Sequence, residues 1–354
     1  MDKLRIGIIG AGGIAQGRHI PTLLKLRERV SIEALYDVNF TTAADASAKF
    51  NIPKVTDSYQ ELFQLVDAVV ICTPNKFHSE IAVAALDAGV HVLCEKPMAM
   101  TSRECEEMIE ASKRSGKVLS IAFHYRFMKE AVAAKKAVAA GEIGKPLVVR
   151  VQALRRRRVP GWGVFTNKEL QGGGSLIDYG CHLLDLSLWL MGNPGPSEVM
   201  GTTYNTLSKM PGQVNLWGAF DYSTFNVDDH VTAYIRFENG TSLLLETSWS
   251  NNIKEDVIEN VSISGDMGGL EVFPFSLNYS KHGMLFNSEA AWLPGEEDPS
   301  IPQAQNFVEA CLGLSEQIVK PEEALQVTQI IEAIYKSSEE GKSVSIQGKG
   351  EMAL

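Results

Sequence analysis

The chain is poor in cysteine, in long apolar runs and in net positive charge. Its five cysteines form no CxxC pair, which argues against both a disulfide framework and a thiolate zinc site. No apolar run approaches the roughly 18 residues that a membrane span requires, and the N-terminal segment lacks a signal-type cleavage site, so we expect a cytoplasmic protein. The net charge of −10 and pI near 5.3 argue against general binding to nucleic acid or to an anionic membrane surface.

What the chain does have is enough apolar sequence for two cores. It contains 354 residues, 45% of them hydrophobic, and a single core rarely extends beyond roughly 250–300 residues. Residues 1–123 alternate apolar β-rich runs with helical segments, which predicts a parallel sheet with crossover helices. Residues 124–354 are richer in β segments with turn signals, and the Phe237–Thr241 stretch predicts a hairpin. We therefore expect an α/β chain with a Rossmann domain over 1–123 and a mostly antiparallel α+β domain over 124–354.

A glycine-rich turn follows the first predicted strand. The sequence GAGGIA places Gly10, Gly12, Gly13 and Ile14 between a strand over 4–10 and a helix, the context in which backbone N–H groups bind a pyrophosphate. About twenty residues later a second strand ends in Asp37, which would bind the ribose hydroxyls and repel a 2′-phosphate. No arginine follows in VNFTTA to neutralise such a phosphate, so the sequence favours NAD over NADP.

Further candidates stand where later strands of the first half end. Ligands of parallel sheets bind outside the carboxyl ends of the strands, so these residues should line the cofactor crevice. They are Thr73, Pro74 and Asn75 after one strand, and Glu95, Lys96 and Pro97 after the next. His78 either faces the cofactor or caps the next helix, and the sequence leaves both open.

The segment GGGSLIDYGCHLLD, residues 172–185, is the most site-like part of the second half. On a regular helix Asp178, His182 and Asp185 would share one face. The alternative is a capping Asp178, a histidine satisfied within the fold and a solvated Asp185. Together with Lys96, the segment supplies the groups that move a proton on and off an alcohol oxygen while a cofactor takes the hydride. No metal site is indicated, and the neighbouring Cys181 points away from His182.

Three further features keep alternatives open. Arg155 to Arg158 are four consecutive arginines, which serve either as ion pairs within or between subunits or as a clamp on a substrate anion. Trp162 covers the nicotinamide or the sugar, or only packs its loop. His124, Tyr125 and Arg126 are candidate substrate contacts with the same ambiguity.

These motifs resemble the glucose–fructose oxidoreductase, inositol dehydrogenase and MocA-like family. GAGGIA, TPNKFH, CEKP, AFHYRF and GGGSLIDYGCHLLD occur in that family's order over essentially the whole chain. The resemblance implies a C-terminal domain with an open sheet whose flat face makes homodimers or homotetramers. It also implies that Lys96, Asp178 and His182 are catalytic, and that a sugar or cyclitol is held between the domains. The arginine run is more basic than the family pattern.

We therefore expect an NAD-dependent sugar or polyol dehydrogenase. His182 would accept the hydroxyl proton, Lys96 would stabilise alkoxide character, and Asp178 would hold the substrate hydroxyl. Two rivals are a non-catalytic NAD- and sugar-binding regulator of the same fold and an NAD-dependent glycosidase that forms no net NADH. Which sugar is oxidised, and at which carbon, is left open by the sequence.

Overall fold

The computed structural model describes residues 3–346, and the chain forms two compact units. The first unit comprises Met1–Phe127 and Glu296–Leu325, and the second comprises Met128–Gly295 and Gln326–Leu354. The chain therefore leaves the first unit after Phe127 and returns to it for one later segment. Within residues 3–346 no helix is both long and apolar enough to cross a membrane.

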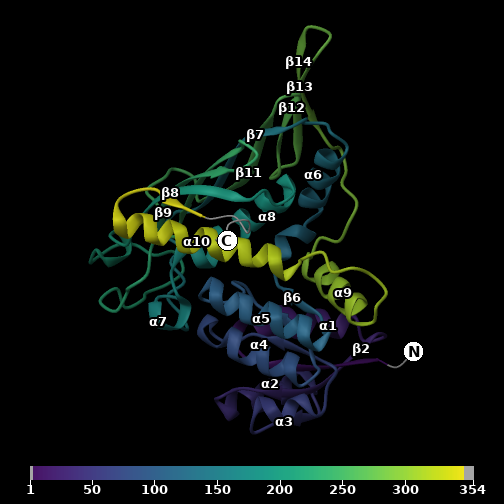
Figure 1. Cartoon of the computed structure of the whole chain (residues 1–354). Helices are drawn as coiled ribbons and strands as arrows, with labels where there is room; N and C mark the ends of the chain where they lie inside the picture. The colour runs from purple at the N-terminus through teal and green to yellow at the C-terminus, as the bar shows by residue number, and fades with distance from the viewer. Residues whose placement is uncertain (1–2, 347–354) are drawn as a thin grey trace, which may run out of the picture. The chain divides into compact units, whose positions relative to one another are not determined.

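The first unit is built on a six-stranded parallel sheet in the order β3-β2-β1-β4-β5-β6, with helices flanking it (Figure 1). This confirms the predicted Rossmann arrangement. The strands are β1 Leu4–Ile9, β2 Val30–Tyr36, β3 Lys54–Val55, β4 Ala68–Ile71, β5 His91–Cys94 and β6 Leu119–Ile121. The helical segments are η1 Ala15–His19, α1 Ile20–Lys25, α2 Phe40–Phe50, α3 Tyr59–Phe63, η2 Asn75–Phe77, α4 His78–Asp87, α5 Ser102–Ser115, η3 His124–Phe127 and α9 Ser300–Cys311.

Local sequence explains where the helices of this unit begin and end. α5 begins at a capping box in which Thr101 and Glu104 satisfy each other's backbone N–H groups, and it ends at Gly116 with φ of 67°. The Asn39 side chain caps α2 by accepting hydrogen bonds from the N–H groups of Thr41 and Thr42. β1 and β4 are almost wholly buried, as strands covered on both faces should be.

The late helix α9 completes the core of the first unit. Its residues Phe307 and Val308 are buried in one apolar cluster with Leu23 of α1 and Ile6 and Ile8 of β1. Nothing in the local sequence of α9 indicates that it packs with strands about 300 residues earlier. Burial of these side chains is what draws residues 296–325 back to the first unit.

The second unit is built on a nine-stranded sheet in the order β14-β13-β12-β11-β7-β10-β9-β8-β15. Among the strands within residues 3–346, β7 and β10 are the only parallel pair of this sheet, which confirms the predicted mostly antiparallel arrangement. The strands are β7 Pro146–Arg155, β8 Pro196–Tyr204, β9 His230–Phe237, β10 Ser242–Ser248, β11 Val257–Gly265, β12 Gly268–Glu271, β13 Ser276–Lys281, β14 Met284–Glu289 and β15 Val344–Ser345. β9 and β10 form the predicted hairpin.

The helical segments of this unit are α6 Lys129–Ala139, α7 Lys168–Gln171, η4 Leu176–Gly180, α8 Cys181–Met191 and η5 Leu207–Lys209, and α10 Pro321–Glu340 runs from the first unit into the second. α8 packs on β7 and β11. α10 lies along β8, where Ser337 and Ser338 accept hydrogen bonds from the backbone N–H groups of Gly201 and Thr203. The β13–β14 hairpin projects beyond the rest of the sheet (Figure 1).

Candidate active site

The glycine turn after β1 lies in close contact with the backbone at the end of β4. Gly10 has φ of 90°, and a Cβ there would lie 2.7 Å from the carbonyl carbon of Cys72 and 2.9 Å from the backbone nitrogen of Thr73. Only glycine fits this position. A Cβ on Gly12 or Gly13 would meet nothing within 4 Å. The turn therefore presses against the end of β4 on one side and leaves open space beside its other glycines, as a site for a pyrophosphate requires.

Asp37 is held beside this turn at the end of β2. Its Oδ2 accepts a hydrogen bond from Ala11 N at 2.8 Å, and its Oδ1 accepts one from Asn39 N at 2.8 Å. A carboxylate oxygen has a second lone pair, so each can still accept a ribose hydroxyl. The following Val38 side chain is almost fully exposed, as an apolar surface for a flat base would be.

The turn after β4 carries Thr73, Pro74 and Asn75. The Thr73 hydroxyl oxygen is buried and has no hydrogen-bond partner among residues 3–346. A buried polar atom without a partner costs about 1–3 kcal/mol, so this hydroxyl suits a bound polar group. The unpartnered Thr73 hydroxyl and the open space at Gly12 and Gly13 together show that the described residues fit a dinucleotide.

The structure gives His78 a third environment besides the two that the sequence left open. Its ring is fully buried, with Nδ1 2.9 Å from Pro97 O and Nε2 3.0 Å from Thr73 O. The ring caps no helix and is directed at the carbonyl groups of two turns. Burial lowers the pKa of His78 although both carbonyls act to raise it. His78 thus ties the turn after β4 to the turn that carries Lys96.

Glu95 and Lys96 follow β5 in a charged and buried setting. Glu95 Oε1 accepts a hydrogen bond from His19 Nε2 at 2.7 Å, and its Oε2 accepts one from Lys96 N at 3.1 Å. Burial acts to raise the pKa of Glu95, but the hydrogen bond and charge of His19, with the charges of Lys96 and Arg18, outweigh it and lower the pKa to about 2. Glu95 is therefore ionised and holds the backbone from which the half-buried Lys96 side chain extends. Sequence reasoning did not single out His19, whose partner stands 76 residues away.

The three candidate residues of η3, His124, Tyr125 and Arg126, differ in how they are engaged. Arg18 Nη1 donates to His124 Nδ1 at 3.1 Å. Burial, the charge of Arg18 and more weakly that of Lys96 lower the pKa of His124 to about 3, so the imidazole is neutral and carries its proton on Nε2. Tyr125 is buried with its ring 4.9 Å from that of His124. Arg126 is ion-paired with Glu323 and donates to Ile318 O at 3.2 Å, both within the first unit.

In the second unit, Asp228 organises the glycine turn that precedes η4. Oδ1 accepts hydrogen bonds from Gly174 N at 2.7 Å and from the Tyr335 hydroxyl at 2.6 Å. Oδ2 accepts from Ser175 Oγ at 2.9 Å and from Leu176 N at 3.0 Å. A Cβ on Gly174 would lie 1.9 Å from Asp228 O, which explains a glycine there. Sequence reasoning missed Asp228, because nothing local connects it with a turn 52 to 54 residues earlier.

Asp178 lies on η4 and accepts a hydrogen bond on Oδ2 from Trp249 Nε1 at 3.0 Å. Arg155 Nη1 is 3.5 Å from the same oxygen. The segment is not the regular helix assumed from the sequence, because Leu176–Gly180 forms a π-helical turn before α8 starts at Cys181. Such turns are frequent at functional sites. Asp185 is fully buried rather than solvated, and His182 is also buried.

Three of the four consecutive arginines contact the segment between β10 and β11. Arg156 donates to Lys254 O at 3.0 Å, Arg157 to Asn252 Oδ1 at 2.6 Å, and Arg158 Nη2 pairs with Asp256 at 3.0 Å. These contacts support the first of the two alternatives, ion pairs and hydrogen bonds within the fold. Arg155 is the member of the run that lies beside Asp178.

Trp162 is 53% exposed, and its ring packs on Trp217 at 5.5 Å and on Phe165 at 6.2 Å. None of the cysteines in the described residues forms a disulfide, and Cys181 Sγ donates to Ile177 O at 2.8 Å rather than to His182. Within residues 3–346 no group of three His, Cys, Asp or Glu side chains is placed to hold a metal.

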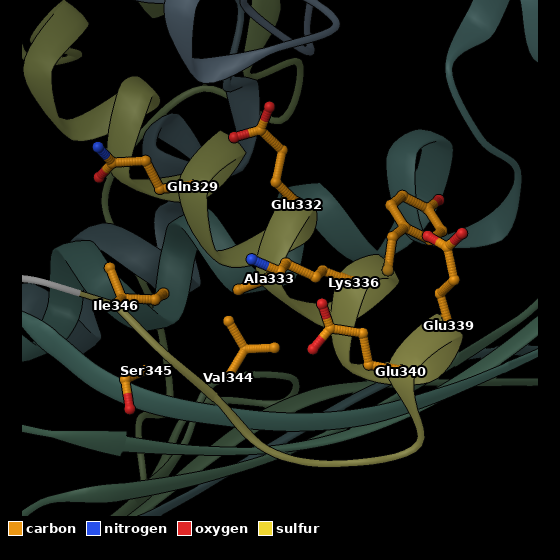
Figure 2. Close-up of a pocket in the computed structure, with 10 residues that line it drawn as sticks. Gln329, Glu332, Ala333, Lys336, Glu339, Glu340, Val344, Ser345 and Ile346 are labelled. Carbon is orange, nitrogen blue, oxygen red and sulfur yellow. The ribbon is translucent and has the colours of Figure 1, made fainter.

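Figure 2 shows a surface pocket of the second unit, lined by one face of α10 and by β15. Glu332, Lys336, Glu339 and Glu340 line it from the helix, and Val344 lines it from the strand. None of the candidate site residues lines this pocket. The candidate site of the second unit is instead the set of side chains around Asp178.

Comparison with known proteins identifies the family and agrees with the fold. Residues 4–123 match the model of the oxidoreductase family with an NAD-binding Rossmann fold, and residues 135–346 match that family's C-terminal alpha/beta domain. D-Glucoside 3-dehydrogenase of Escherichia coli K12 is 36% identical over 98% of this chain and 98% of its own length.

Two solved structures match nearly the whole chain. The aldose-aldose oxidoreductase of Caulobacter crescentus, complexed with glycerol, is 26% identical with a TM-score of 0.82, covering 98% of this chain and 100% of that one. A levoglucosan dehydrogenase in complex with NADH and levoglucosan is 25% identical with a TM-score of 0.81, with the same coverage. The chain therefore belongs to the glucose–fructose oxidoreductase, inositol dehydrogenase and MocA-like family of NAD-binding oxidoreductases.

Proposed function

We propose that the protein transfers a hydride between NAD and a secondary hydroxyl of a sugar, a sugar derivative or a cyclitol. The observation that carries this proposal is the full-length similarity to D-glucoside 3-dehydrogenase, together with Asp178 held between an indole N–H and a guanidinium. A carboxylate so oriented suits the recognition of a hydroxyl group.

We assign the cofactor contacts to the turns at the strand ends. We propose residues 1–123 as the NAD-binding domain and 124–354 as the substrate-binding and oligomerisation domain, except that His124–Phe127 and Glu296–Leu325 belong to the first compact unit. The pyrophosphate is assigned to Gly10, Gly12, Gly13 and Ile14, and the ribose to Asp37. The nicotinamide half is assigned to Thr73, Pro74, Asn75, Glu95 and Lys96, with His78 supporting the turns. Of the alternatives that the sequence left open for Trp162, we favour contact with the sugar, because its ring packs on Trp217, which lies beside Arg155. Asp37 favours NAD over NADP because a carboxylate at this place would repel a 2′-phosphate.

The proposed acid–base chemistry uses Lys96, Asp178 and His182. Bound NAD supplies the hydride acceptor at its nicotinamide ring. The His182 imidazole accepts the hydroxyl proton, and the Lys96 ammonium donates a hydrogen bond to the same oxygen as negative charge develops there. Asp178 accepts a hydrogen bond from a substrate hydroxyl and orients the ring. His124, Tyr125 and Arg126 complete the proposed substrate contacts, with the neutral His124 as a donor through Nε2.

Two alternative functions differ from the proposed dehydrogenase in the products that they form. A regulator of the same fold would bind NAD and sugar without turnover, and an NAD-dependent glycosidase would cleave a glycoside without net NADH. Inositols, aldoses, anhydrosugars and glycosides should be screened for absorbance at 340 nm with product analysis. Net NADH with an oxidised sugar supports the dehydrogenase. Glycoside cleavage without NADH supports the glycosidase, and binding without either product supports the regulator.

We also propose a homodimer or homotetramer assembled through the open face of the second sheet. Met200, Tyr234 and Leu244 are paired neighbours on β8, β9 and β10, and all three are exposed. Such an apolar row across adjacent strands is typical of an interface. Light scattering tests this: the wild-type protein should have the mass of a dimer or tetramer, and Tyr234→Glu should have a lower mass because a charge is placed in the interface.

We place the protein in the cytoplasm and expect no nucleic-acid partner. None of the cysteines in the described residues is in a disulfide, as expected in a reducing compartment. The net charge is −10, and three of the four clustered arginines are engaged within the fold.

A further inference from the structure

Arg155 differs from its three neighbours in how its guanidinium is held. It lies over the Tyr179 ring at 3.9 Å from the centroid and over the Trp217 ring at 4.8 Å. Two aromatic rings therefore hold the planar group, a setting that suits arginine and not lysine. In the described part of the chain its one ionic partner is Asp178, at 3.5 Å. The guanidinium thus joins Trp217 to the candidate catalytic carboxylate.

Trp217 stands on a long loop, residues 205–229, that is bound to the loop after β7. Leu216 N donates to Arg157 O at 2.8 Å. The Asn215 side chain accepts from Val159 N at 2.8 Å and donates to Val159 O at 3.0 Å. A Cβ on Gly161 would lie 2.3 Å from Phe220 Cβ, so the two loops are in close contact. The position of Trp217 is therefore set by several bonds and by packing.

The same loops are anchored to the support of Asp178. Val159 and Phe225 are buried in one apolar cluster with Trp249, whose indole N–H donates to Asp178. On the outer side, Trp217 is 40% exposed and packs against the more exposed Trp162. A surface made of two indoles thus lies one arginine side chain away from Asp178.

We propose that Trp217, Trp162 and the edge of the Arg155 guanidinium form a subsite for the ring next to the one that is oxidised. The occupant is the aglycone or second sugar ring of a neutral glycoside. This inference rests on the proposed function, because it takes Asp178 to bind the ring that reacts. Indole faces bind the apolar faces of rings, while the arginine donates hydrogen bonds to ring hydroxyls.

The charges around Arg155 favour a neutral occupant. The positive charge of Arg155 is opposed by Asp178 at 3.5 Å, and the Tyr179 ring beneath it hydrogen-bonds to Glu259. A phosphate or carboxylate at this place would meet two carboxylates beside one guanidinium. A sugar phosphate is therefore the less suitable occupant.

The test compares a phenyl glucoside with the methyl glucoside of the same anomeric series. Both have the same reacting ring, so the ratio of their kcat/KM values isolates the neighbouring group. Trp217→Ala should lower the phenyl-to-methyl ratio by about tenfold, because losing one aromatic contact and the apolar area that it buries weakens binding of the phenyl group by about that factor. Trp292→Ala is the matched control, because Trp292 is 78% exposed on the segment after β14. The control should keep the wild-type ratio.

A second variant separates the subsite from a loop that has merely lost its fold. Trp217→Phe retains an aromatic face, so its phenyl-to-methyl ratio of kcat/KM should be close to that of the wild-type protein. In saturation-transfer NMR, the phenyl protons of the glucoside should receive magnetisation from the wild-type protein but not from Trp217→Ala. A ratio within twofold of wild type in Trp217→Ala overturns the inference. The inference is also overturned if the wild-type enzyme oxidises inositols or glucose 6-phosphate but neither glucoside. That result would leave the proposed hydride transfer intact. Absence of NAD reduction with every compound overturns both.

Discussion

The substitution Asp228→Asn is the sharpest perturbation that the second unit offers. Asparagine has nearly the shape of aspartate, but it carries one acceptor oxygen and one NH₂ donor in place of two acceptors. Each Asp228 oxygen accepts one hydrogen bond from a hydroxyl and one from a backbone N–H. In either amide orientation, the NH₂ group therefore faces one hydroxyl and one backbone N–H.

The magnitude follows from this pairing. A hydroxyl of Tyr335 or Ser175 can rotate and accept from the new NH₂ group, but the N–H of Gly174 or Leu176 cannot. One buried N–H loses its partner in either orientation, at a cost of about 1–3 kcal/mol. For a domain of 150–250 residues, about 2 kcal/mol lowers Tm by roughly 4–8 °C. The turn leads into η4, which carries Asp178, and a displacement of Asp178 by about 1 Å can lower kcat by up to about 10²-fold.

Three measurements on Asp228→Asn test this reasoning: the melting temperature, kcat with a glycoside, and the Kd for NAD. The first two should fall as stated, and the third should stay within about twofold, because most of the proposed NAD contacts belong to the first unit. Asp221→Asn is the control, since Asp221 is exposed and bonds only near neighbours. A variant that loses less than about 0.5 kcal/mol and keeps its kcat would refute the role of Asp228.

Three further predictions concern the first unit. Lys96→Met should keep NAD binding but lower kcat by about 10²–10⁴-fold, and near-normal NADH formation would remove the lysine from the mechanism. Asp37→Asn should reduce the preference for NAD over NADP by at least about tenfold, because a repulsion between like charges is removed; kcat/KM with both cofactors measures this. His124 has a pKa of about 3 in the folded protein and about 6.5 unfolded, so the unfolded state gains a proton first as pH falls. Stability is thus fully present above pH 6.5 and is lost below it by about 1.4 kcal/mol per pH unit. Urea unfolding of His124→Asn should show a flatter slope between pH 6 and 4, and an identical slope would contradict the assignment.

Patterns within short windows predicted most of the elements correctly. The alternation in residues 1–123 identified the parallel sheet, and the two β segments around Asn239-Gly240 identified a hairpin. The short β3 and α3 were not predicted, because two or five residues carry too little periodicity. The π-helical turn at η4 was also missed, since the same residues satisfy the pattern of a regular helix.

Contacts between distant residues account for what the sequence could not show. His19 with Glu95, Asp228 with the turn at Gly174, and Trp249 with Asp178 are each joined across 50 or more residues. Each partner alone is an ordinary polar or aromatic residue on a strand, helix or loop. Pairings of this kind depend on how the elements pack and have no local signature.

The amino-acid order by itself determined the Rossmann unit, and it was enough to propose NAD as the preferred cofactor and to propose residues for the chemistry. Those properties depend on backbone geometry and side-chain type within a few positions. The tertiary structure alone decided which side chains support them, that α9 returns to the first unit, and that only Arg155 of its run reaches Asp178. The chemical type of a side chain determines which groups it can bind. What it does bind depends on the groups that folding brings within about 3 Å of it.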